Sequence, residues 1–542
     1  MTFRFLAGAG LTVALLAACG RGPELPPAEQ LTDAVRQAVE QADGRREAAR
    51  SALEGFYTER DFKLAWVPAG RSGGNTRRLL DAIDQAQTHG LDPQRYGQPA
   101  LAREIDELDA THAPDAQTLA ALDTRLSLAY LDLAIDLDQG QIDPGSADKR
   151  WPTRDGKVDY GASLRDGLNG DVAEQLNALA PDQPAYARLL EQRRRYANIA
   201  ENGGWETVPA GETLTEGDRS PRVEPLRQRL ASTGDLDAAA ATDATLFDAA
   251  VIQALRRFQQ RHGLEEDAVL GPSTLEALNV TADERLRHID ANLERWRWLP
   301  ADLGARHIIV NIPEYHVHAF DGGRPALDMK VIVGKTYEDR ETPVFTDEMQ
   351  EVVFRPLWGI PQSIAVEEIL PKAREDLGYL AEKQYQIAAD YSPDAKVFKP
   401  TPENLDRVEA GELRMRQLGG RHNSLGLVKF LFPNQFAVYL HDTPADHLFE
   451  KRERSFSHGC IRLERPADMA SFVLSGQPGW DETAIDEAMH AGDRQSVNLD
   501  QSLPVYILYW TAFVHEDGVM QFREDIYGHD EPLLLAMQQS GE

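Results

Sequence analysis

The spacing of apolar residues changes near residue 307, and this change constrains the fold more than any other feature. Upstream, apolar residues recur every three or four positions, as in the segment 116–140. Downstream they alternate with polar residues, as in 307–312 and 315–320. A helix places every third or fourth side chain on one face, and a strand places every second. The chain is therefore predicted to be α+β, helical first and mainly β afterwards.

The length of 542 residues is too great for one hydrophobic core and predicts several domains. We expect an all-helical scaffold, a small three-helix domain and a mainly-β domain with an inserted lid. The expected ranges are a leader at 1–18, a tether at 19–30, the scaffold at 31–205, a linker at 206–221, the three-helix domain at 222–280, a connecting helix at 281–302, the β domain at 303–528 with its lid at about 372–426, and a tail at 529–542.

The net charge of -31 argues against one class of partner. Nucleic-acid binding needs a concentrated basic surface, and no stretch rich in lysine and arginine occurs. We therefore expect no nucleic acid among the partners.

The first twenty residues have the pattern of an export signal. Arg4 precedes an uncharged apolar run from Phe5 to Ala18, which is short for a membrane-spanning helix. The run ends in Leu-Ala-Ala-Cys19-Gly20, which resembles a bacterial lipobox. That resemblance implies cleavage before Cys19, lipidation of its sulfur and, from Gly20, a periplasmic protein anchored to the outer membrane by lipid. The alternative is an ordinary cleavable signal with a chance cysteine.

The chain has two cysteines, Cys19 and Cys460. If Cys19 is lipidated, Cys460 is the only thiol of the mature chain and no internal disulfide can form. A solitary thiol in an exported protein is either a buried small apolar group or a reactive one.

The residues around Cys460 favour a reactive thiol. Gly459 leaves the backbone free of side-chain bulk, so that amides can reach an oxyanion. The adjacent His458 is poorly placed to be the base, because neighbouring side chains point apart. A better base is His441, in the expected strand 436–441, where alternation places Tyr439 and His441 on one face and Val438 and Leu440 on the core face. His307, His316 and His318 are interpreted as structural residues.

Two segments resemble known families. In 222–280, Phe-Gln-x-x-His-Gly-Leu followed by Gly-x-x-Thr-x-x-Ala-Leu-Asn resembles peptidoglycan-binding domain 1. His441-Asp-Thr-Pro followed, 460 − 441 = 19 residues later, by Ser457-His-Gly-Cys460-Ile-Arg462 resembles the active site of YkuD-type L,D-transpeptidases. Further segments from Trp358 and from Leu427 resemble the large periplasmic subgroup, in which serine often stands at the position of His458.

The second resemblance implies a cysteine acyltransferase that works without a metal or cofactor. Cys460 would be the nucleophile, His441 the base, and the amides around Gly459 and Cys460 the oxyanion hole. The substrate-contacting residues would be Tyr439, Trp358, Ser457, His458 and Arg462. The partners would be peptidoglycan stem peptides and glycan, and the product a 3→3 cross-link formed through a thioester with release of D-alanine.

Several alternatives remain open from the residues. The same site would serve an L,D-carboxypeptidase or an enzyme that attaches lipoproteins. Cys460 could be inert in a wall anchor, for which a thiol pKa near 8.5 would argue, whereas a strongly depressed pKa would favour the enzyme. A papain-like protease is disfavoured because its cysteine precedes its histidine. Arg462 could instead pair with Glu464, and Trp358 and Tyr439 could be core aromatics.

Overall fold

The computed structural model describes residues 24–147, 158–237, 243–337, 340–490 and 492–540. The leader, the lipobox and Cys19 therefore lie outside the described residues. The chain divides into two compact units, of which the first comprises Met1–Gln87, Leu91–Leu137 and Val158–Leu179 and the second comprises Thr88–Gly90, Asp138–Lys157 and Ala180–Glu542.

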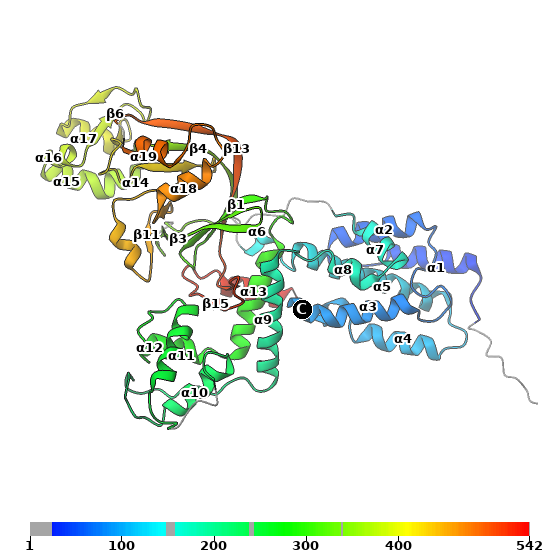
Figure 1. Ribbon diagram of the computed structural model, residues 1–542. Coiled ribbons are helices and arrows are strands. Elements are labelled where there is room, and N and C mark those ends of the chain that lie inside the picture. Colours follow the sequence, from blue (N-terminus) through cyan, green and yellow to red (C-terminus); the bar gives the residue numbers. More distant parts are fainter. Residues whose placement is uncertain (1–23, 148–157, 238–242, 338–339, 491, 541–542) are drawn as a thin grey trace, which may run out of the picture. The chain divides into compact units, whose positions relative to one another are not determined.

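The first unit is all-helical, as expected, and is coloured blue to cyan in Figure 1. The helical segment predicted at 116–140 is confirmed as α5, a helix of 24 residues. The unit ends at Leu179 and not at the expected 205, because the next long helix packs within the second unit. Its helices are α1 (Ala28–Glu40), α2 (Glu47–Glu59), α3 (Gly74–Gln85), η2 (Pro93–Tyr96), α4 (Ala100–Ala110), α5 (Ala116–Gln139, to Leu137 in this unit), α7 (Tyr160–Asn169) and α8 (Val172–Asn177).

A buried carboxylate organises this helical unit. Asp123 on α5 is fully buried and accepts a hydrogen bond of 2.6 Å from the hydroxyl of Tyr57 on α2. Its oxygens also accept from the amides of Ala65, Trp66 and Val67, at 2.7 to 3.1 Å. These donors satisfy a group that would otherwise be costly to bury. The carboxylate thus ties α2 and the following loop to α5.

The second unit begins with a helical part that contains the predicted three-helix domain. Its core includes Val223, Leu226, Val251, Phe258 and Leu278, which come from all three helices. The expected linker at 206–221 also contributes to this core, through Val208 and Leu214. The helices are α6 (Pro144–Ala147), α9 (Pro184–Glu201), α10 (Val223–Ser232), α11 (Ala249–Arg261), α12 (Pro272–Asn279) and α13 (Ala282–Arg297).

The rest of the second unit is built on a closed β-sheet. The sheet order is β11-β3-β12-β10-β9-β4-β13-β1-β2, and β2 also pairs with β3, so that eight strands form a ring with β11 outside it. The interior of an eight-stranded barrel is just wide enough to be filled by side chains. The strands are β1 (Arg306–Asn311), β2 (His316–Asp321), β3 (Arg324–Gly334), β4 (Phe345–Phe354), β9 (Val428–Leu431), β10 (Leu440–His441), β11 (Ser455–Ser457), β12 (Ile461–Leu463) and β13 (Gln495–Leu508).

Alternation along the strands separates a core face from an outer face. Val310, Val352, Phe430, Leu440 and Ile461 are fully buried in one apolar cluster. Residues of opposite parity on the same strands therefore point out of the ring. Helices α18 (Pro466–Val473), α19 (Glu482–His490) and α20 (Asp530–Gln539) add apolar residues to this cluster, so the expected tail at 529–542 includes a packed helix.

A short hairpin follows the last strand of the barrel. That strand, β13, ends at Leu508 and pairs with β1 and β4. Only β14 (Ala512–Val514) pairs with β15 (Met520–Phe522). This hairpin packs with α9 and α13 in a separate apolar cluster, in which Trp296 stacks on Trp510 at 4.4 Å between ring centroids. The residues after Leu508 therefore leave the barrel sheet and pack on α9 and α13.

The insertion forms a subdomain with its own apolar core. Its four-stranded sheet has the order β5-β8-β6-β7, and its core cluster runs from Ile360 to Met415. The insertion therefore begins before the expected residue 372. The strands at its two ends, β5 and β8, pair with each other, and Trp358 lies opposite Gln417. Its elements, yellow-green in Figure 1, are β5 (Trp358–Ile360), α14 (Gln362–Ile364), η3 (Ala365–Ile369), α15 (Leu370–Glu375), α16 (Gly378–Glu382), β6 (Tyr385–Ala388), β7 (Val397–Phe398), α17 (Pro402–Glu409) and β8 (Arg414–Gln417).

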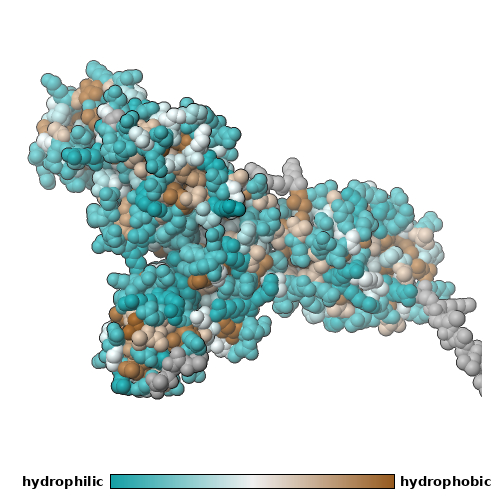
Figure 2. Space-filling model, in the orientation of Figure 1, coloured by the Kyte–Doolittle hydropathy of each residue, from teal (hydrophilic) through white to brown (hydrophobic). Residues whose placement is uncertain are grey.

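The surface agrees with the acidic composition. Figure 2 shows a mainly hydrophilic face on which hydrophobic residues form small patches. Large apolar side chains that are more than two-fifths exposed are few and scattered, namely Leu25, Tyr337, Tyr391, Val397, Val519 and Leu535. Within the described ranges, no helix has both the length and the apolar character needed to cross a membrane.

Candidate active site

Two neighbouring parallel strands bring the predicted nucleophile and base to one face of the ring. His441 on β10 lies opposite Arg462 on β12, and the amide of Ile461 donates to the carbonyl of Tyr439 at 3.1 Å. Because alternate residues share a face, Tyr439, His441, Cys460 and Arg462 all point outward. The predicted faces of 438–441 are thus confirmed, with Val438 and Leu440 in the core. The expected strand 436–441, however, is regular only at Leu440–His441.

The Cys460 thiol is half-buried and uncharged at neutral pH. Its sulfur lies 3.8 Å from the carbonyl oxygen of Ala437, to which the thiol donates. Burial raises the pKa of Cys460 above its ordinary value, although the amide and side chain of Tyr439 and the charges of Arg462 and Lys429 act in the opposite direction. The strongly depressed pKa expected of an activated thiol is therefore absent from the substrate-free chain.

The imidazole of His441 is held as a neutral base. Its Nδ1 lies 2.5 Å from the carbonyl oxygen of Asp442. A carbonyl can only accept, so Nδ1 carries the proton and Nε2 has a free lone pair. Burial, followed by the positive charge of Arg462, lowers the pKa of His441 to about 3. His441 can therefore accept a proton throughout the neutral range.

His441 and Cys460 are diagonal neighbours across the two strands. Among the hydrogen bonds of the described residues, none joins the imidazole to the sulfur. Catalytic hydrogen bonds are commonly long in substrate-free enzymes and shorten in the complex. The arrangement thus places base and nucleophile on one face without a formed proton bridge.

A row of basic groups crosses the outer face at His441. Lys429 on β9 and Arg462 on β12 are its direct neighbours on either side. Arg462 does not pair with Glu464, which lies 3.6 Å from the ammonium of Lys330. The Nε atom of Arg462 is buried and has no hydrogen-bond partner in the described part of the chain. The row therefore offers unneutralised positive charge beside the thiol.

The loop before the nucleophile is braced by Ser457. Its hydroxyl donates to the carbonyl of Cys460 at 2.5 Å and accepts from the amide of Gly459 at 3.1 Å. Gly459 has a φ of +108°, a conformation that residues with a Cβ rarely adopt. The hydroxyl of Thr342 donates to the Gly459 carbonyl at 2.8 Å. Because the Gly459 amide is already engaged, its place in an oxyanion hole stays a prediction.

His458 faces the insertion and not the thiol. Its Nε2 lies 2.9 Å from Oε1 of Glu368 on η3 and 3.0 Å from a guanidinium nitrogen of Arg340. Arg340 also pairs with Glu367 at 2.8 Å. Burial lowers the pKa of His458, which favours the neutral ring that accepts from Arg340. His458 thus connects the nucleophile loop to the insertion.

The two predicted aromatic contacts occupy different places. Tyr439 is half-buried beside His441, with 5.7 Å between the ring centroids, and the ammonium of Lys429 lies 5.3 Å from its ring centre. Trp358 lies in β5 and packs on the apolar core of the insertion. Tyr439 therefore belongs to the site, and Trp358 to the subdomain beside it.

Sequence reasoning missed Lys429, Arg340 and Glu368. Lys429 stands between the core residues Val428 and Phe430, so that alternation alone places it outward. Its position opposite His441 depends on strand pairing, for which the local sequence carries no signal. The contacts of Arg340 and Glu368 with His458 join segments that are 118 and 90 residues away in the chain.

Three parts of the chain match known protein families. Residues 305–480 match the model of the YkuD L,D-transpeptidase catalytic domain, residues 51–192 a scaffold domain, and residues 219–278 a "putative peptidoglycan binding domain". A Haemophilus influenzae protein described as "putative L,D-transpeptidase" is 33% identical over 230 residues, which is 42% of this chain and 45% of that protein.

One solved structure has weak similarity to this chain. An L,D-transpeptidase from Xylanimonas cellulosilytica, residues 123–326, is 15% identical and matches over 55% of this chain and 99% of its own, with a TM-score of 0.18. That superposition is too poor to argue from. The family models and the motif residues on β10 and β12 are what identify this part of the chain. Residues 305–480 are therefore assigned to the YkuD L,D-transpeptidase catalytic domain family, residues 51–192 to the scaffold domain family and residues 219–278 to the "putative peptidoglycan binding domain" family.

Proposed function

We propose that this protein is an L,D-transpeptidase of the cell envelope that forms 3→3 cross-links between peptidoglycan stem peptides. The observation that carries the proposal is the shared outer face on which Cys460, a neutral His441 and an unpaired Arg462 lie together. A nucleophile, a base and an anion-binding group are the parts that acyl transfer to a charged peptide needs.

In the first half-reaction the sulfur of Cys460 attacks the carbonyl carbon between the third stem residue and the terminal D-alanine. The thiol proton moves to Nε2 of His441, which then gives it to the departing amine as the C–N bond breaks. Because the pKa of His441 lies below that of the thiol, the proton moves during the attack and no resting ion pair is required. The product is a thioester on Cys460 and free D-alanine.

The second half-reaction transfers the acyl group to the side-chain amine of another stem. Water in place of the amine would give carboxypeptidase activity, and a lipoprotein amine would give attachment. The oxyanion of each step needs backbone donors, each typically worth about 2.7–4 kcal/mol. We assign one of these to the amide of Cys460, since that of Gly459 bonds to Ser457.

The basic row supports an anionic substrate. Stem peptides carry carboxylates, and a guanidinium binds a carboxylate with two parallel hydrogen bonds. Arg462, whose buried Nε has no partner in the described structure, is the group placed to do so. Lys429, on the other side of His441, adds positive charge. The peptidoglycan-binding domain would raise the local concentration of the same polymer.

The insertion is suited to covering this face. Glu368 and Glu367 on η3 contact His458 and Arg340, so that the insertion touches the nucleophile loop through polar pairs. Such pairs break at little cost near a surface. We propose that the insertion opens and closes over the thiol and excludes competing water.

A wall anchor without catalysis is the second candidate, because the pKa of Cys460 is raised and not depressed. One experiment separates the two functions. The purified chain is incubated with disaccharide-tetrapeptide, and the products are analysed by mass spectrometry. The enzyme gives a dimer and free D-alanine, whereas the anchor returns the substrate unchanged.

The matched control is Cys460→Ala. The proposal requires that this variant form no product while still binding to purified cell-wall sacculi through the peptidoglycan-binding domain. If the variant produced the same dimer as the natural chain, the thioester mechanism would be excluded. A trimmed monomer from the natural chain would identify the carboxypeptidase instead.

We further propose a periplasmic location with a lipid anchor on Cys19. The leader and its resemblance to a lipobox support this proposal. In cells, the natural chain is expected in the outer-membrane fraction, and Cys19→Ala in the soluble periplasmic fraction. Equal distribution of the two chains would argue for an ordinary cleaved signal.

A further inference from the structure

A second cluster of reactive side chains lies on the outer face of the same barrel. It comprises Glu314 in the turn before β2, His316 and His318 on β2, Asp328 on β3, and His515 in the β14–β15 turn. None of these residues contacts the Cys460 thiol or its neighbours described above. His307, in contrast, is a structural histidine as expected, stacked on Phe320 and bonded to the carbonyl of Gly304.

Strand geometry explains why the cluster converges. His316 and His318 are two residues apart on β2 and share its outer face, because Val317 and Ala319 are in the core. Asp328 lies directly opposite His318 on β3. Tyr315 has a φ of +59°, and this left-handed turn brings Glu314 to within 3.1 Å of His318.

We propose that Glu314, His316 and His318 form a binding site for one divalent transition-metal ion, with Zn²⁺ as the best match. One ligand atom from each residue lies within 4.8 Å of those of the other two. Two imidazoles and a carboxylate are donors that Zn²⁺ accepts, in tetrahedral geometry at about 2.0–2.2 Å. The corresponding tetrahedron edge is roughly 3.3 Å, close to the 3.1 Å between Nε2 of His318 and Oε2 of Glu314.

The surrounding groups hold the ligands in place. One oxygen of Asp328 lies 3.2 Å from Nδ1 of His316 and 2.9 Å from Nδ1 of His318. Glu314, which is only 7% exposed, accepts from Asn311 at 3.1 Å and meets Nε2 of His515 at 3.1 Å. Outer carboxylates that orient ligating imidazoles are a regular part of metal sites. In the metal-free cluster a proton lies between His318 and Glu314, and the ion would replace it.

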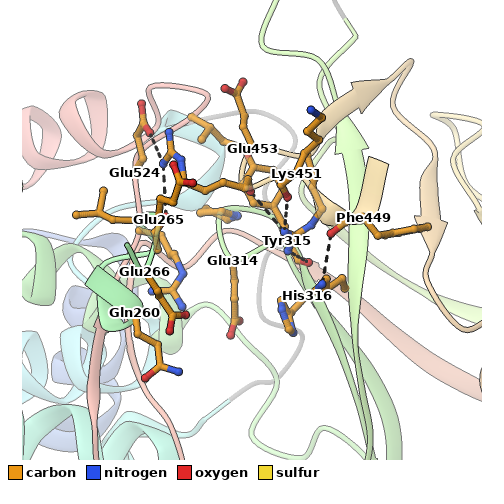
Figure 3. Close-up of a pocket in the computed structure, with 18 of the residues that line it drawn as sticks. Gln260, Glu265, Glu266, Glu314, Tyr315, His316, Phe449, Lys451, Glu453 and Glu524 are labelled. Atoms are coloured by element: carbon orange, nitrogen blue, oxygen red, sulfur yellow. Dashed lines mark hydrogen bonds and ion pairs between the residues drawn. The ribbon is translucent and has the colours of Figure 1, made fainter. Parts of the chain in front are cut away.

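The site has access from a cavity. Glu314 and His316 line a hollow of about 640 Å³, whose walls also include Lys330 and Arg454. Figure 3 shows the carboxylate of Glu314 and the ring of His316 close together at one side of this cavity. A three-ligand site that opens onto such a space keeps a coordination position free for water or a further donor.

All three ligands come from the turn before β2 and from β2 itself. The bound ion would fix the carboxylate of Glu314, whose other oxygen meets Nε2 of His515 in the β14–β15 hairpin, which packs on α9 and α13. We therefore assign the ion a stabilising role at the junction between the barrel and the helical part of the second unit. The Cys460 chemistry does not require it.

The test uses the full-length chain, stripped with chelator and titrated with Zn²⁺ against a chromophoric chelator. Because a thiol can also bind Zn²⁺, every chain in the experiment carries Cys19→Ala and Cys460→Ala. We expect one equivalent to bind, and its affinity to fall at least about 100-fold in the His316→Ala/His318→Ala variant. Undiminished binding by that variant, or no binding by the parent chain, would overturn the proposal.

Two further variants guard against a folding artefact. Asp328→Asn keeps the three ligands and removes the outer carboxylate, so affinity is expected to fall about 10- to 100-fold. His490→Ala removes an exposed histidine that also contacts an aspartate, Asp486 at 3.2 Å, and should leave affinity unchanged. Zn²⁺ should raise the melting temperature of the parent and of His490→Ala, but not that of the double variant. Equal shifts in all chains would mean that the ion binds elsewhere.

Discussion

Asp123 in the helical unit is fully buried and Arg462 on the barrel is half-buried, and the surroundings of these two charged groups differ. The carboxylate of Asp123 accepts from Tyr57 and from three successive amides. The guanidinium of Arg462 has a buried Nε without a partner in the described structure, and burial lowers its pKa. All the hydrogen-bond donors that Asp123 needs come from the chain itself. The guanidinium of Arg462, in contrast, has no negatively charged partner in the described structure.

This difference separates a buried polar group that stabilises the fold from one that serves the candidate active site. A saturated buried group contributes to stability, and removing it leaves its donors without partners. An unsaturated buried charge costs stability and is retained where a ligand completes it. We therefore expect changes at Asp123 to alter folding and changes around Cys460 to alter chemistry.

The largest expected effect is on turnover. Cys460→Ser keeps the shape of the side chain but replaces the thiol with a hydroxyl of much higher pKa. Product formation from disaccharide-tetrapeptide should fall at least ~10³-fold, while the melting temperature stays within 2–3 °C, on the order of what a small surface change produces. A stable, active serine variant would show that Cys460 is not the nucleophile.

Asp123→Ala should produce the opposite result. It removes the acceptor of several buried donors, so the unit should lose about 3 kcal/mol or more of unfolding free energy in urea denaturation. Cross-linking per folded molecule should not change. Asp33→Ala, at an exposed position of α1, is the control and should cost less than ~0.5 kcal/mol. Equal stability of the two variants would contradict the structural role of Asp123.

Acid should destabilise the catalytic unit through His441. Its folded pKa of about 3 lies below the ordinary value of 6.5, so the unfolded chain binds a proton that the folded chain does not. Stability is therefore full above about pH 6.5 and falls as the pH decreases towards 3. At pH 4 the loss should reach up to about 3 kcal/mol. His441→Gln should remove this component, which denaturation curves at pH 7 and pH 4 would reveal.

Arg462→Met should lower catalysis less than Cys460→Ser does. Loss of a charge-assisted contact with a substrate carboxylate should lower kcat/KM roughly 10- to 100-fold, mainly through KM. Because the unpaired charge is also removed, stability should stay the same or rise. Unchanged kinetics together with a large loss of stability would make Arg462 a structural residue like Asp123.

The spacing of apolar residues along the sequence predicted much of this architecture. Alternation in 436–441 placed Val438 and Leu440 in the core and His441 outside, and the segment 222–280 forms the expected three-helix core. These predictions succeeded because the side-chain period is a property of the backbone itself.

Features that depend on long-range pairing were not predictable. Lys429 beside His441 results from the β9–β10 register, and the contact of Glu368 with His458 joins the insertion to a distant loop. The raised pKa of Cys460 results from burial, which no local motif encodes. The end of the helical unit at Leu179 likewise depends on where α9 packs.

The insertion leaves and rejoins the barrel through one pair of strands. Phe354 pairs with Val428 at the end of β4 and β9, and Trp358 pairs with Gln417 a few residues further on. Everything between these points folds around its own core. The subdomain can therefore be lengthened, shortened or exchanged without shifting the register that sets His441 beside Arg462. Substrate preference can diverge in such a fold while the reacting atoms stay in place.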